Sequence, residues 1–371
     1  MAIGFLPPLH GLRAIAAMAV LLFHWCQLFP GFNIWIAQLH VPGHPWVNPS
    51  LPWSMGWQGV SLFFVLSGYL LTSQWLDRVM TAQSVVHFYK RRILRIYPAA
   101  WLQLALLLLL AQTWPALFEQ ASWNKWLLNA ALWVNLPPWF EAPLNVVWWT
   151  LPIELMFYMV LPFLVYCQRR FGLGVMVIAL LSVTVSWRWW VMLKYAGRDL
   201  SATELLVVLD ALPGVLMTFG AGFAAAIVQD QIKKAQAVPL LWLSLLLFVT
   251  LQTLLVSFIE VYWQGGWLLC LWNSSLALSM AGIVIAFCKL PESAAAKALS
   301  TRPMIALGDW SFGIYLWHFP VLQLLHRLYP EWAATAFSSL LALGVTLVLT
   351  LTMAALSFTQ VERPLMRLKF A

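Results

Sequence analysis

The sequence predicts an all-α protein, a polytopic bundle of about ten transmembrane helices, in which residues 1–371 form a single integral-membrane domain. Hydrophobic residues make up 62% of the chain and charged residues only 9%, whereas a soluble domain carries about 25% charged residues. The apolar residues also fall into runs near the length of about 20 residues that a helix needs to cross a bilayer. Such a chain cannot cover a water-facing surface with polar groups, which indicates that hydrocarbon is its solvent.

The apolar runs give the positions of the spans. We place them near 9–29, 59–76, 96–113, 146–167, 173–191, 206–228, 239–259, 267–288, 304–326 and 336–359. The segment 114–145 is rich in Trp and Pro, and its apolar stretch is too short to cross a bilayer. We therefore expect an interfacial or re-entrant segment there.

The basic residues predict the orientation of the chain. Most of the 21 Lys and Arg residues follow the even-numbered spans, with clusters at 90–92, 169–170 and 233–234. Short loops rich in Lys and Arg remain in the cytoplasm, so both termini are predicted to be cytoplasmic. The loop 30–58 has no charged residue and is predicted to face outward. The net charge of +8 is thus explained by topology, and we expect no nucleic-acid partner.

The cysteines and the N-terminus exclude other classes. Cys26, Cys167, Cys270 and Cys288 lie in or beside apolar runs without paired spacing. We therefore expect neither a disulfide nor a metal site. The N-terminus lacks a basic region before its apolar stretch, so the first span is expected to be retained and not cleaved as a signal peptide.

Ionisable residues inside spans are the first candidates for function in a membrane protein. The first span contains Arg13 and His24. Eleven steps of a helix make about three full turns, so both side chains project from one face, about 16 Å apart along the axis. In one interpretation Arg13 reaches the headgroups and His24 bonds a carbonyl. In the other they belong to a polar track in which His24 is a general base.

Two further segments near the predicted cytoplasmic side carry polar residues. Ser67 and Gly68 in the second span fit close packing between helices, or close approach of a substrate to the backbone. Arg92 and Arg95 are three residues apart and share a helix face. A guanidinium pair suits a phosphorylated ligand bound in bidentate fashion, although such clusters also anchor helices to anionic lipids.

The fourth and ninth spans add a carboxylate and a second histidine. Thr150 and Glu154 are four residues apart on one face, and a carboxylate at this depth requires a partner. Glu154 is therefore expected to face the interior, where it pairs with Arg13 or His24 or tunes the histidine. In the ninth span, small or polar residues form one helical stripe. Its members are Gly308, Ser311, Tyr315 and His318.

Together these elements resemble the acyltransferase-3 family of bacterial membrane O-acyltransferases. The resemblance rests on five motifs in family order, spread over nearly the whole chain. They are Arg13-x10-His24, Phe63-Phe64-x-x-Ser67-Gly68-Tyr69, Arg92-x-x-Arg95, Thr150-Leu151-x-x-Glu154 and Tyr315-Leu316-x-His318. The sequence departs from the family pattern at Pro152, which puts the local helix geometry in question. The chain ends soon after its last span, so we expect a member with the membrane domain alone.

The resemblance implies an acyl-CoA donor, usually acetyl-CoA, and an acceptor hydroxyl on a glycan or lipid-linked glycan, in a bacterial cytoplasmic (inner) membrane. It assigns His24, Glu154 and His318 to catalysis, with His24 as general base and His318 as a relay or orienting residue. On the donor side, Arg92 and Arg95 hold the CoA phosphates and Arg13 lines the approach to the thioester. Ser67, Tyr315 or His24 carries the acyl group if an acyl-enzyme forms. Acetyl is the default acyl group, with succinyl or longer chains as alternatives.

Two other classes share parts of this pattern. A transporter or flippase for a lipid-linked glycan has a similar number of spans and a polar track, but transporters often show repeated halves, and this sequence shows none. A scaffold in an envelope-polymer assembly leaves the polar residues on single helix faces unexplained. The Trp residues of the loops at 30–58 and 114–145 suit sugar stacking, although Trp is also the ordinary interfacial anchor.

Overall fold

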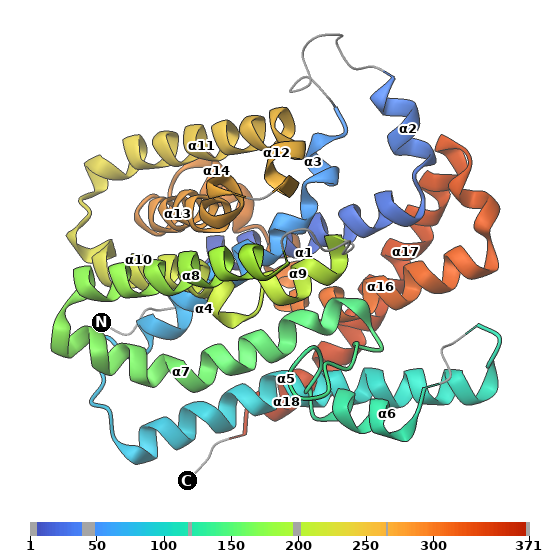
Figure 1. The fold of residues 1–371 in the computed structure, drawn as a ribbon, viewed down its shortest axis with the longest axis horizontal. Coiled ribbons are helices and arrows are strands. Elements are labelled where there is room, and N and C mark those ends of the chain that lie inside the picture. Colours follow the sequence, from blue (N-terminus) through green and yellow to red (C-terminus); the bar gives the residue numbers. More distant parts are fainter. Residues whose placement is uncertain (1–5, 39–48, 118–120, 196–201, 265, 369–371) are drawn as a thin grey trace. The chain divides into compact units, whose positions relative to one another are not determined.

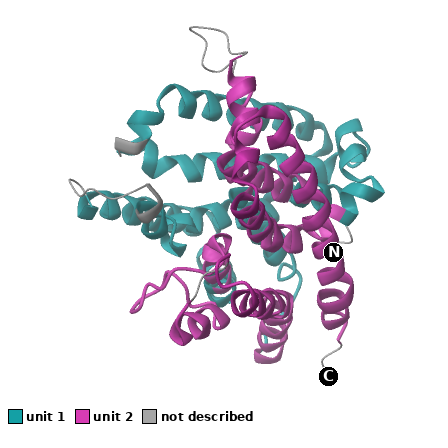
Figure 2. Ribbon diagram, turned by 90° about the vertical axis from the view of Figure 1, so that its right-hand side faces the viewer, with its two compact units in different colours: residues 1–13, 60–81, 156–306 teal, residues 14–59, 82–155, 307–371 magenta. Residues whose placement is uncertain are grey.

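The computed structural model describes residues 6–38, 49–117, 121–195, 202–264 and 266–368. Over these residues all regular secondary structure is helical, which confirms the all-α class (Figure 1). The chain forms two compact units, distinguished by colour in Figure 2. Unit 1 comprises residues 1–13, 60–81 and 156–306, and unit 2 comprises residues 14–59, 82–155 and 307–371. The expectation of one domain over the whole chain stays a prediction.

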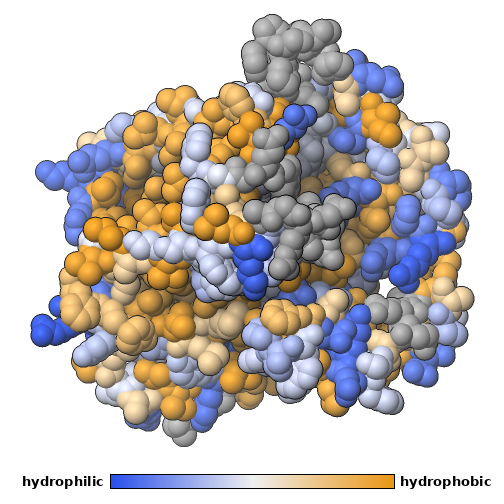
Figure 3. All heavy atoms as spheres, viewed as in Figure 1, coloured by the Kyte–Doolittle hydropathy of each residue, from blue (hydrophilic) through white to orange (hydrophobic). Residues whose placement is uncertain are grey.

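Eight helical segments of the described residues are long and apolar enough to cross a membrane. They are Pro7–Leu28, Ala82–Thr113, Val146–Phe171, Leu173–Tyr195, Leu212–Gln231, Lys234–Ser257, Trp267–Lys289 and Ala336–Met366. The two other predicted spans coincide with the helices Gly59–Ser73 and Ser311–Leu328. Apolar residues cover much of the surface seen in Figure 3, as expected for a membrane protein. The count of ten spans and the cytoplasmic termini stay predictions.

Unit 1 is built around two long, deeply buried helices, α10 and α13. Its helices are α1 (Pro7–Leu28, as far as Arg13), α4 (Gly59–Ser73), α7 (Thr150–Phe171, from Met156), α8 (Leu173–Tyr195), α9 (Ala202–Leu209), α10 (Leu212–Val228), η3 (Gln229–Gln231), α11 (Lys234–Ser257), α12 (Ile259–Gln264), α13 (Trp267–Lys289), α14 (Ala294–Leu299) and the first part of α15 (Arg302–Asp309). Helix α10 packs against α8 and α13, and α11 packs against the other side of α13.

Glycines allow α4 to approach α10 closely. A Cβ atom on Gly68 would overlap the carbonyl of Phe219, and one on Gly222 would overlap the carbonyl of Val65. Only glycine leaves room for two helix backbones at this separation. The Ser-Gly element of the second span therefore has a packing role at Gly68.

Unit 2 holds three helices that share an apolar core. Its helices are α1 from Ala14, α2 (Gly31–Ala37), α3 (Leu51–Ser54), η1 (Gly56–Gln58), α5 (Ala82–Thr113), α6 (Trp123–Ala130), η2 (Val146–Trp149), the start of α7, the end of α15, α16 (Ser311–Leu328), η4 (Pro330–Ala333), α17 (Ala336–Ser357), η5 (Phe358–Glu362) and α18 (Arg363–Met366). Trp25 of α1 and Phe29, just after its end, pack with Leu322 of α16 and Ala342 of α17. The indole of Trp25 also donates to the carbonyl of Ser339 at 2.8 Å.

Two predicted elements have different boundaries, whereas the segment 114–145 agrees with its prediction. Helix α5 begins at Ala82 and not near 96, because the basic segment before the apolar run consists largely of good helix formers. The span predicted at 206–228 is two helices, since α9 ends at Leu209 and α10 starts with a proline in its first turn. In the segment 114–145, α6 has only eight residues, too few to cross a bilayer.

The span predicted at 304–326 is also interrupted. Helix α15 ends at Asp309 and α16 begins at Ser311, because Trp310 adopts φ −82° and ψ −2°, which lies outside the usual α-helical region. Ser311, Tyr315 and His318 therefore share one helix, whereas Gly308 belongs to α15. The expectation of one continuous stripe that includes Gly308 was wrong.

Candidate functional site

The two histidines singled out in the sequence lie against each other in unit 2. His318 Nε2 is 3.1 Å from His24 Nδ1, and the ring centroids are 5.1 Å apart. His24 comes from α1 and His318 from α16, 294 positions further along the chain. The shared core of α1, α16 and α17 thus brings together two residues whose proximity their spacing does not reveal.

Two backbone carbonyls determine the protonation of this pair. His318 Nδ1 lies 3.0 Å from the carbonyl oxygen of Ile314, and His24 Nδ1 lies 3.0 Å from that of Val20. A carbonyl oxygen only accepts, so each Nδ1 is assigned a hydrogen. His318 Nε2 is then the nitrogen with the lone pair, and it accepts from His24 Nδ1. This arrangement leaves a lone pair on His24 Nε2.

The histidines differ in their access to the surface. The side chain of His318 is fully buried, at 0% exposure, whereas His24 is half-buried. Among the described residues no hydrogen bond reaches His24 Nε2. The rings of Phe23 and Phe319 lie 5.2 and 5.0 Å from the His24 ring and give it apolar neighbours. His24 is therefore the member of the pair that a substrate can meet, and His318 supports it from the interior.

Polar groups from η2 and α7 reach the same face of α16. The hydroxyl of Tyr315 donates to the carbonyl of Val147 at 2.7 Å and lies 3.0 Å from Thr150 Oγ1. Its ring is 5.9 Å from that of His318. Glu154, one turn after Thr150, is half-buried and is a charged neighbour of Tyr315. Tyr315 thus connects the start of α7 with the histidine pair.

The start of α7 is regular despite the proline that departs from the family pattern. Helix α7 begins at Thr150 and is preceded by η2, so Pro152 lies in its first turn. The backbone nitrogens of the first turn have no partner within the helix, so a proline costs nothing there. Thr150 and Glu154 accordingly keep the helical spacing that the sequence analysis assumed.

A buried amide network, absent from the sequence analysis, fixes α16 against α5. Gln103 Nε2 donates to the carbonyl of Leu316 at 2.7 Å. Its Oε1 accepts from Asn145 Nδ2 at 2.9 Å and from Trp148 Nε1 at 2.7 Å. Gln103 and Trp148 are fully buried. The signal in the sequence is a lone amide in a run of leucines, since buried polar groups require partners.

The arginine pair predicted to hold phosphates lies on the same helix as this network. Arg92 and Arg95 in α5 are half-buried, whereas Lys90 and Arg91 are exposed. Arg92 and Gln103 are eleven residues apart, so they lie on one face about 16 Å apart along the axis. The guanidinium of Arg92 lies 5.9 Å from the ring of Phe88, within reach of a cation–π contact.

Arg13 and Ser67 are described with unit 1. Arg13 lies in α1 and Ser67 in α4, and both are half-buried. Helix α1 is unbroken from Pro7 to Leu28, so Arg13 and His24 have the helical spacing expected of them. The roles of Arg13 and Ser67 toward an acyl donor stay predictions.

Unit 1 also contains a buried ion pair that the sequence analysis missed. Arg188 is fully buried. Its Nη1 lies 2.7 Å from Asp210 Oδ1, and its Nε donates to the carbonyl of Leu269 at 2.9 Å. Asn273 Nδ2 donates to the same carboxylate oxygen at 3.3 Å. Beside them, burial raises the pKa of Tyr262 in α12 above its ordinary value.

No group of three or more His, Cys, Asp or Glu side chains in the described part of the chain is arranged to hold a metal ion. The cysteines carry free thiols.

Comparison with known proteins places these residues in a family context. The model of a family described as an acyltransferase domain matches residues 8–358. The O-acetyltransferase OatA of Staphylococcus aureus is 26% identical over 400 residues, which covers 99% of this chain and 58% of that protein. The peptidoglycan O-acetyltransferase OatA of Listeria monocytogenes is 25% identical over 390 residues, covering 97% of this chain and 56% of that protein.

A third relative has a similar name. The putative peptidoglycan O-acetyltransferase YrhL of Bacillus subtilis is 28% identical over 400 residues, with 97% of this chain and 55% of that protein covered. The chain thus spans somewhat more than half the length of these relatives. No solved structure matches it.

Proposed function

Because the chain belongs to the acyltransferase-3 family, as the match over residues 8–358 shows, we propose that it is a multi-pass membrane O-acyltransferase of the bacterial inner membrane. It moves an acyl group, by default acetyl, from acyl-CoA on the cytoplasmic side to a hydroxyl of an envelope glycan. The observation that carries this proposal is the His24–His318 pair, with its lone pair on the more exposed ring.

His24 is the general base of the proposed reaction. Its Nε2 takes the proton of the acceptor hydroxyl as that oxygen attacks the thioester carbonyl. The carbon–sulfur bond then breaks, and the proton on Nε2 passes to the CoA sulfur as it leaves. Throughout, His24 Nδ1 donates to His318 Nε2, which holds the tautomer with Nε2 unprotonated and steadies the imidazolium when it forms.

The donor is bound through its phosphates. Arg92 and Arg95 are the half-buried members of a mostly exposed basic cluster, and a guanidinium matches phosphate oxygens in bidentate fashion. Arg13, on the helix that carries His24, lines the approach of the thioester. If an acyl-enzyme forms, Ser67, Tyr315 or His24 carries the acyl group. The hydroxyl of Tyr315 already donates to the carbonyl of Val147, which favours an orienting role for this residue.

Glu154 supports the same face of the site. It lies one turn after Thr150, whose hydroxyl is within hydrogen-bond distance of Tyr315. We propose that this half-buried carboxylate, a charged neighbour of Tyr315, stabilises positive charge that develops on the imidazoles during proton transfer. In this way we propose that Glu154 tunes the basicity of His24.

The acceptor is proposed to be peptidoglycan or a related envelope glycan. The relatives from Listeria monocytogenes and Bacillus subtilis carry peptidoglycan O-acetyltransferase in their names, and the family match extends over almost the whole chain. Transfer of an acetyl group to a sugar hydroxyl uses the general-base chemistry available at His24.

The test is an assay of the purified chain in proteoliposomes, with acetyl-CoA and a soluble peptidoglycan fragment. We expect release of free CoA thiol that depends on the glycan, together with an acetylated glycan detected by mass spectrometry. Movement of a lipid-linked glycan across the vesicle membrane without thiol release would favour a transporter and contradict the proposal.

A further inference from the structure

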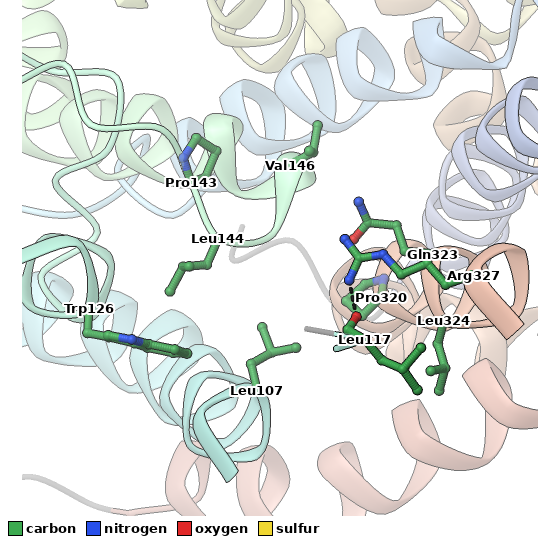
Figure 4. A pocket seen from close by; sticks show the side chains of 10 residues that line it. All are labelled: Leu107, Leu117, Trp126, Pro143, Leu144, Val146, Pro320, Gln323, Leu324 and Arg327. Carbon is green, nitrogen blue, oxygen red and sulfur yellow. Dashed lines mark hydrogen bonds between the residues drawn. The ribbon is translucent and has the colours of Figure 1, made fainter. Parts of the chain in front are cut away.

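Unit 2 contains a cavity on the side of α16 that faces away from the histidine pair. Its volume is about 110 Å³, smaller than the sites of about 300–1,000 Å³ that hold whole small molecules, so it has room for only part of a ligand. Its walls come from α5, α6, the turn at 143–146 and α16 (Figure 4). The α16 residues on its wall are Pro320, Gln323, Leu324 and Arg327. At about 100° per residue they lie opposite His318 on the helix.

The cavity is long enough to take part of a hydrocarbon chain. The α16 wall runs from Pro320 to Arg327, seven helical steps or about 10 Å. Arg327 stands just beyond the end of the predicted span at 304–326, so we expect it at the level of the headgroups, with Pro320 two turns deeper. The remaining wall residues are apolar apart from the indole nitrogen of Trp126, and they are Leu107, Leu117, Trp126, Pro143, Leu144 and Val146. An apolar hollow of this depth suits an acyl or prenyl chain.

The polar side chains of Gln323 and Arg327 both belong to the α16 wall of the cavity. Figure 4 shows Gln323 and Arg327 together on one wall, across from Trp126 and Leu107. The guanidinium of Arg327 donates from Nη1 to the carbonyl of Leu117, and a guanidinium has five N–H donors. No carboxylate of the described residues forms an ion pair with Arg327. The nearby Glu141 has its own partner, Lys125, at 3.8 Å.

We propose that this cavity binds a phosphate-bearing lipid, with its chain along α16 and its phosphate on Arg327. The guanidinium takes two phosphate oxygens in bidentate fashion, and the Gln323 amide donates to a third oxygen. The donor nucleotide does not belong here, because Leu107 and Arg92 are fifteen residues apart on α5, about 22 Å along its axis. The site is thus separate from the proposed catalytic residues. Lipid binding at this site can therefore be tested, and refuted, whether or not the protein transfers acyl groups.

Two lipids have this chemistry, phosphatidylglycerol of the bilayer and a polyprenyl monophosphate. Each is added to the protein in a neutral detergent, and its apparent affinity is measured by native mass spectrometry. Diacylglycerol, which lacks the phosphate, serves as the ligand control. The variants are Arg327→Gln, which removes the charge, and Leu324→Trp, which fills the hollow. Lys194→Gln, which removes an exposed charge in unit 1, is the matched control.

We expect Arg327→Gln to bind at least one of the two phosphate lipids at least about tenfold more weakly than the wild-type chain, since a charge-assisted hydrogen bond is lost. Lys194→Gln should bind that lipid as tightly as the wild-type chain. Leu324→Trp should weaken binding as well. Preference for the polyprenyl phosphate would identify a carrier lipid as the occupant, and equal binding would identify phosphate lipids in general. Diacylglycerol bound as tightly as either phospholipid, or unchanged affinity in both pocket variants, would overturn the proposal.

Discussion

His24 Nδ1 lies 3.1 Å from His318 Nε2, and each ring also directs its Nδ1 toward a carbonyl of its own helix, at 3.0 Å. With a hydrogen on each Nδ1, these contacts make His24 the donor and His318 the acceptor of the hydrogen bond between the rings. The proton between the rings belongs to His24, and the lone pair that remains lies on the half-buried ring. In the proposed reaction, a buried histidine that accepts a hydrogen bond would orient His24 as a carboxylate orients the histidine in other catalytic pairs, without adding a second charge.

Because His318 accepts the hydrogen bond from His24, substitutions of His318 that keep an acceptor should reduce activity less than those that remove it. His318→Leu removes the acceptor for His24 Nδ1 and should lower kcat about tenfold to a hundredfold, because the tautomer and orientation of the base are lost. KM for the acyl donor should change little. His318→Gln retains an acceptor oxygen and should recover part of the activity. Steady-state thiol release gives both constants. Equal loss in the two variants, or a change in KM alone, would remove His318 from this orienting role.

The amide network at Gln103 should be important for stability. Gln103→Leu leaves the indole of Trp148 without its acceptor and removes one of the two acceptors of the Asn145 amide, which keeps the carbonyl of Leu316. A buried unsatisfied group costs about 1–3 kcal/mol. The thermal midpoint of the detergent-solubilised protein should therefore fall clearly. Gln112→Leu, at an exposed position of the same helix, is the control and should change it little. A Gln103→Leu variant as stable as wild type would show that the network does not hold α16 against α5.

The arginine pair should act on the donor alone. Arg92→Gln and Arg95→Gln should raise KM for acetyl-CoA about tenfold, because a charge-assisted contact to a phosphate is removed. With S-acetylpantetheine, which lacks the nucleotide phosphates, the same variants should behave like wild type. Arg91→Gln removes an exposed charge of the same cluster and serves as the control. A loss of similar size with both donors would indicate that the arginines support the fold instead.

The buried ion pair of unit 1 predicts a contrast between two aspartates. Asp210→Asn leaves the guanidinium of the fully buried Arg188 without its counter-ion, and breaking a buried pair costs about 3–5 kcal/mol. Asp230 lies 3.7 Å from Lys289 with its side chain 87% exposed, so Asp230→Asn should change stability by less than about 1 kcal/mol. Denaturation of the two variants under the same conditions tests this. Similar stabilities would mean that Arg188 is solvated in the membrane-embedded protein.

The sequence predicted much of the fold, because a bilayer imposes a length and a polarity on each span. The residues at which helices begin and end were harder to predict from the sequence. Helix α5 extends beyond its apolar run because helix formation does not stop at the membrane surface, and the interruption at Trp310 involves neither glycine nor proline, the residues that usually mark such a point.

The site was predicted in part. Helical periodicity showed which face of its helix carries His24 and which carries His318. Periodicity does not show which helix packs against that face, and only the packing of α1 on α16 brings the two rings together. Gln103 and Arg188 were missed for a related reason. The role of each depends on acceptors supplied by other helices, the carbonyl of Leu316 for Gln103 and that of Leu269 for Arg188.

The central claim is that His24 is the general base, and its most direct test is glycan-dependent release of CoA thiol by His24→Ala. His326→Ala is the matched control, since His326 lies on α16 with its ring 5.5 Å from Phe29 and has no role in the proposed chemistry. The account predicts that His24→Ala loses at least about a hundredfold in rate while folded protein stays in the membrane, and that His326→Ala stays within about threefold of wild type. Transfer by folded His24→Ala at the wild-type rate would contradict it.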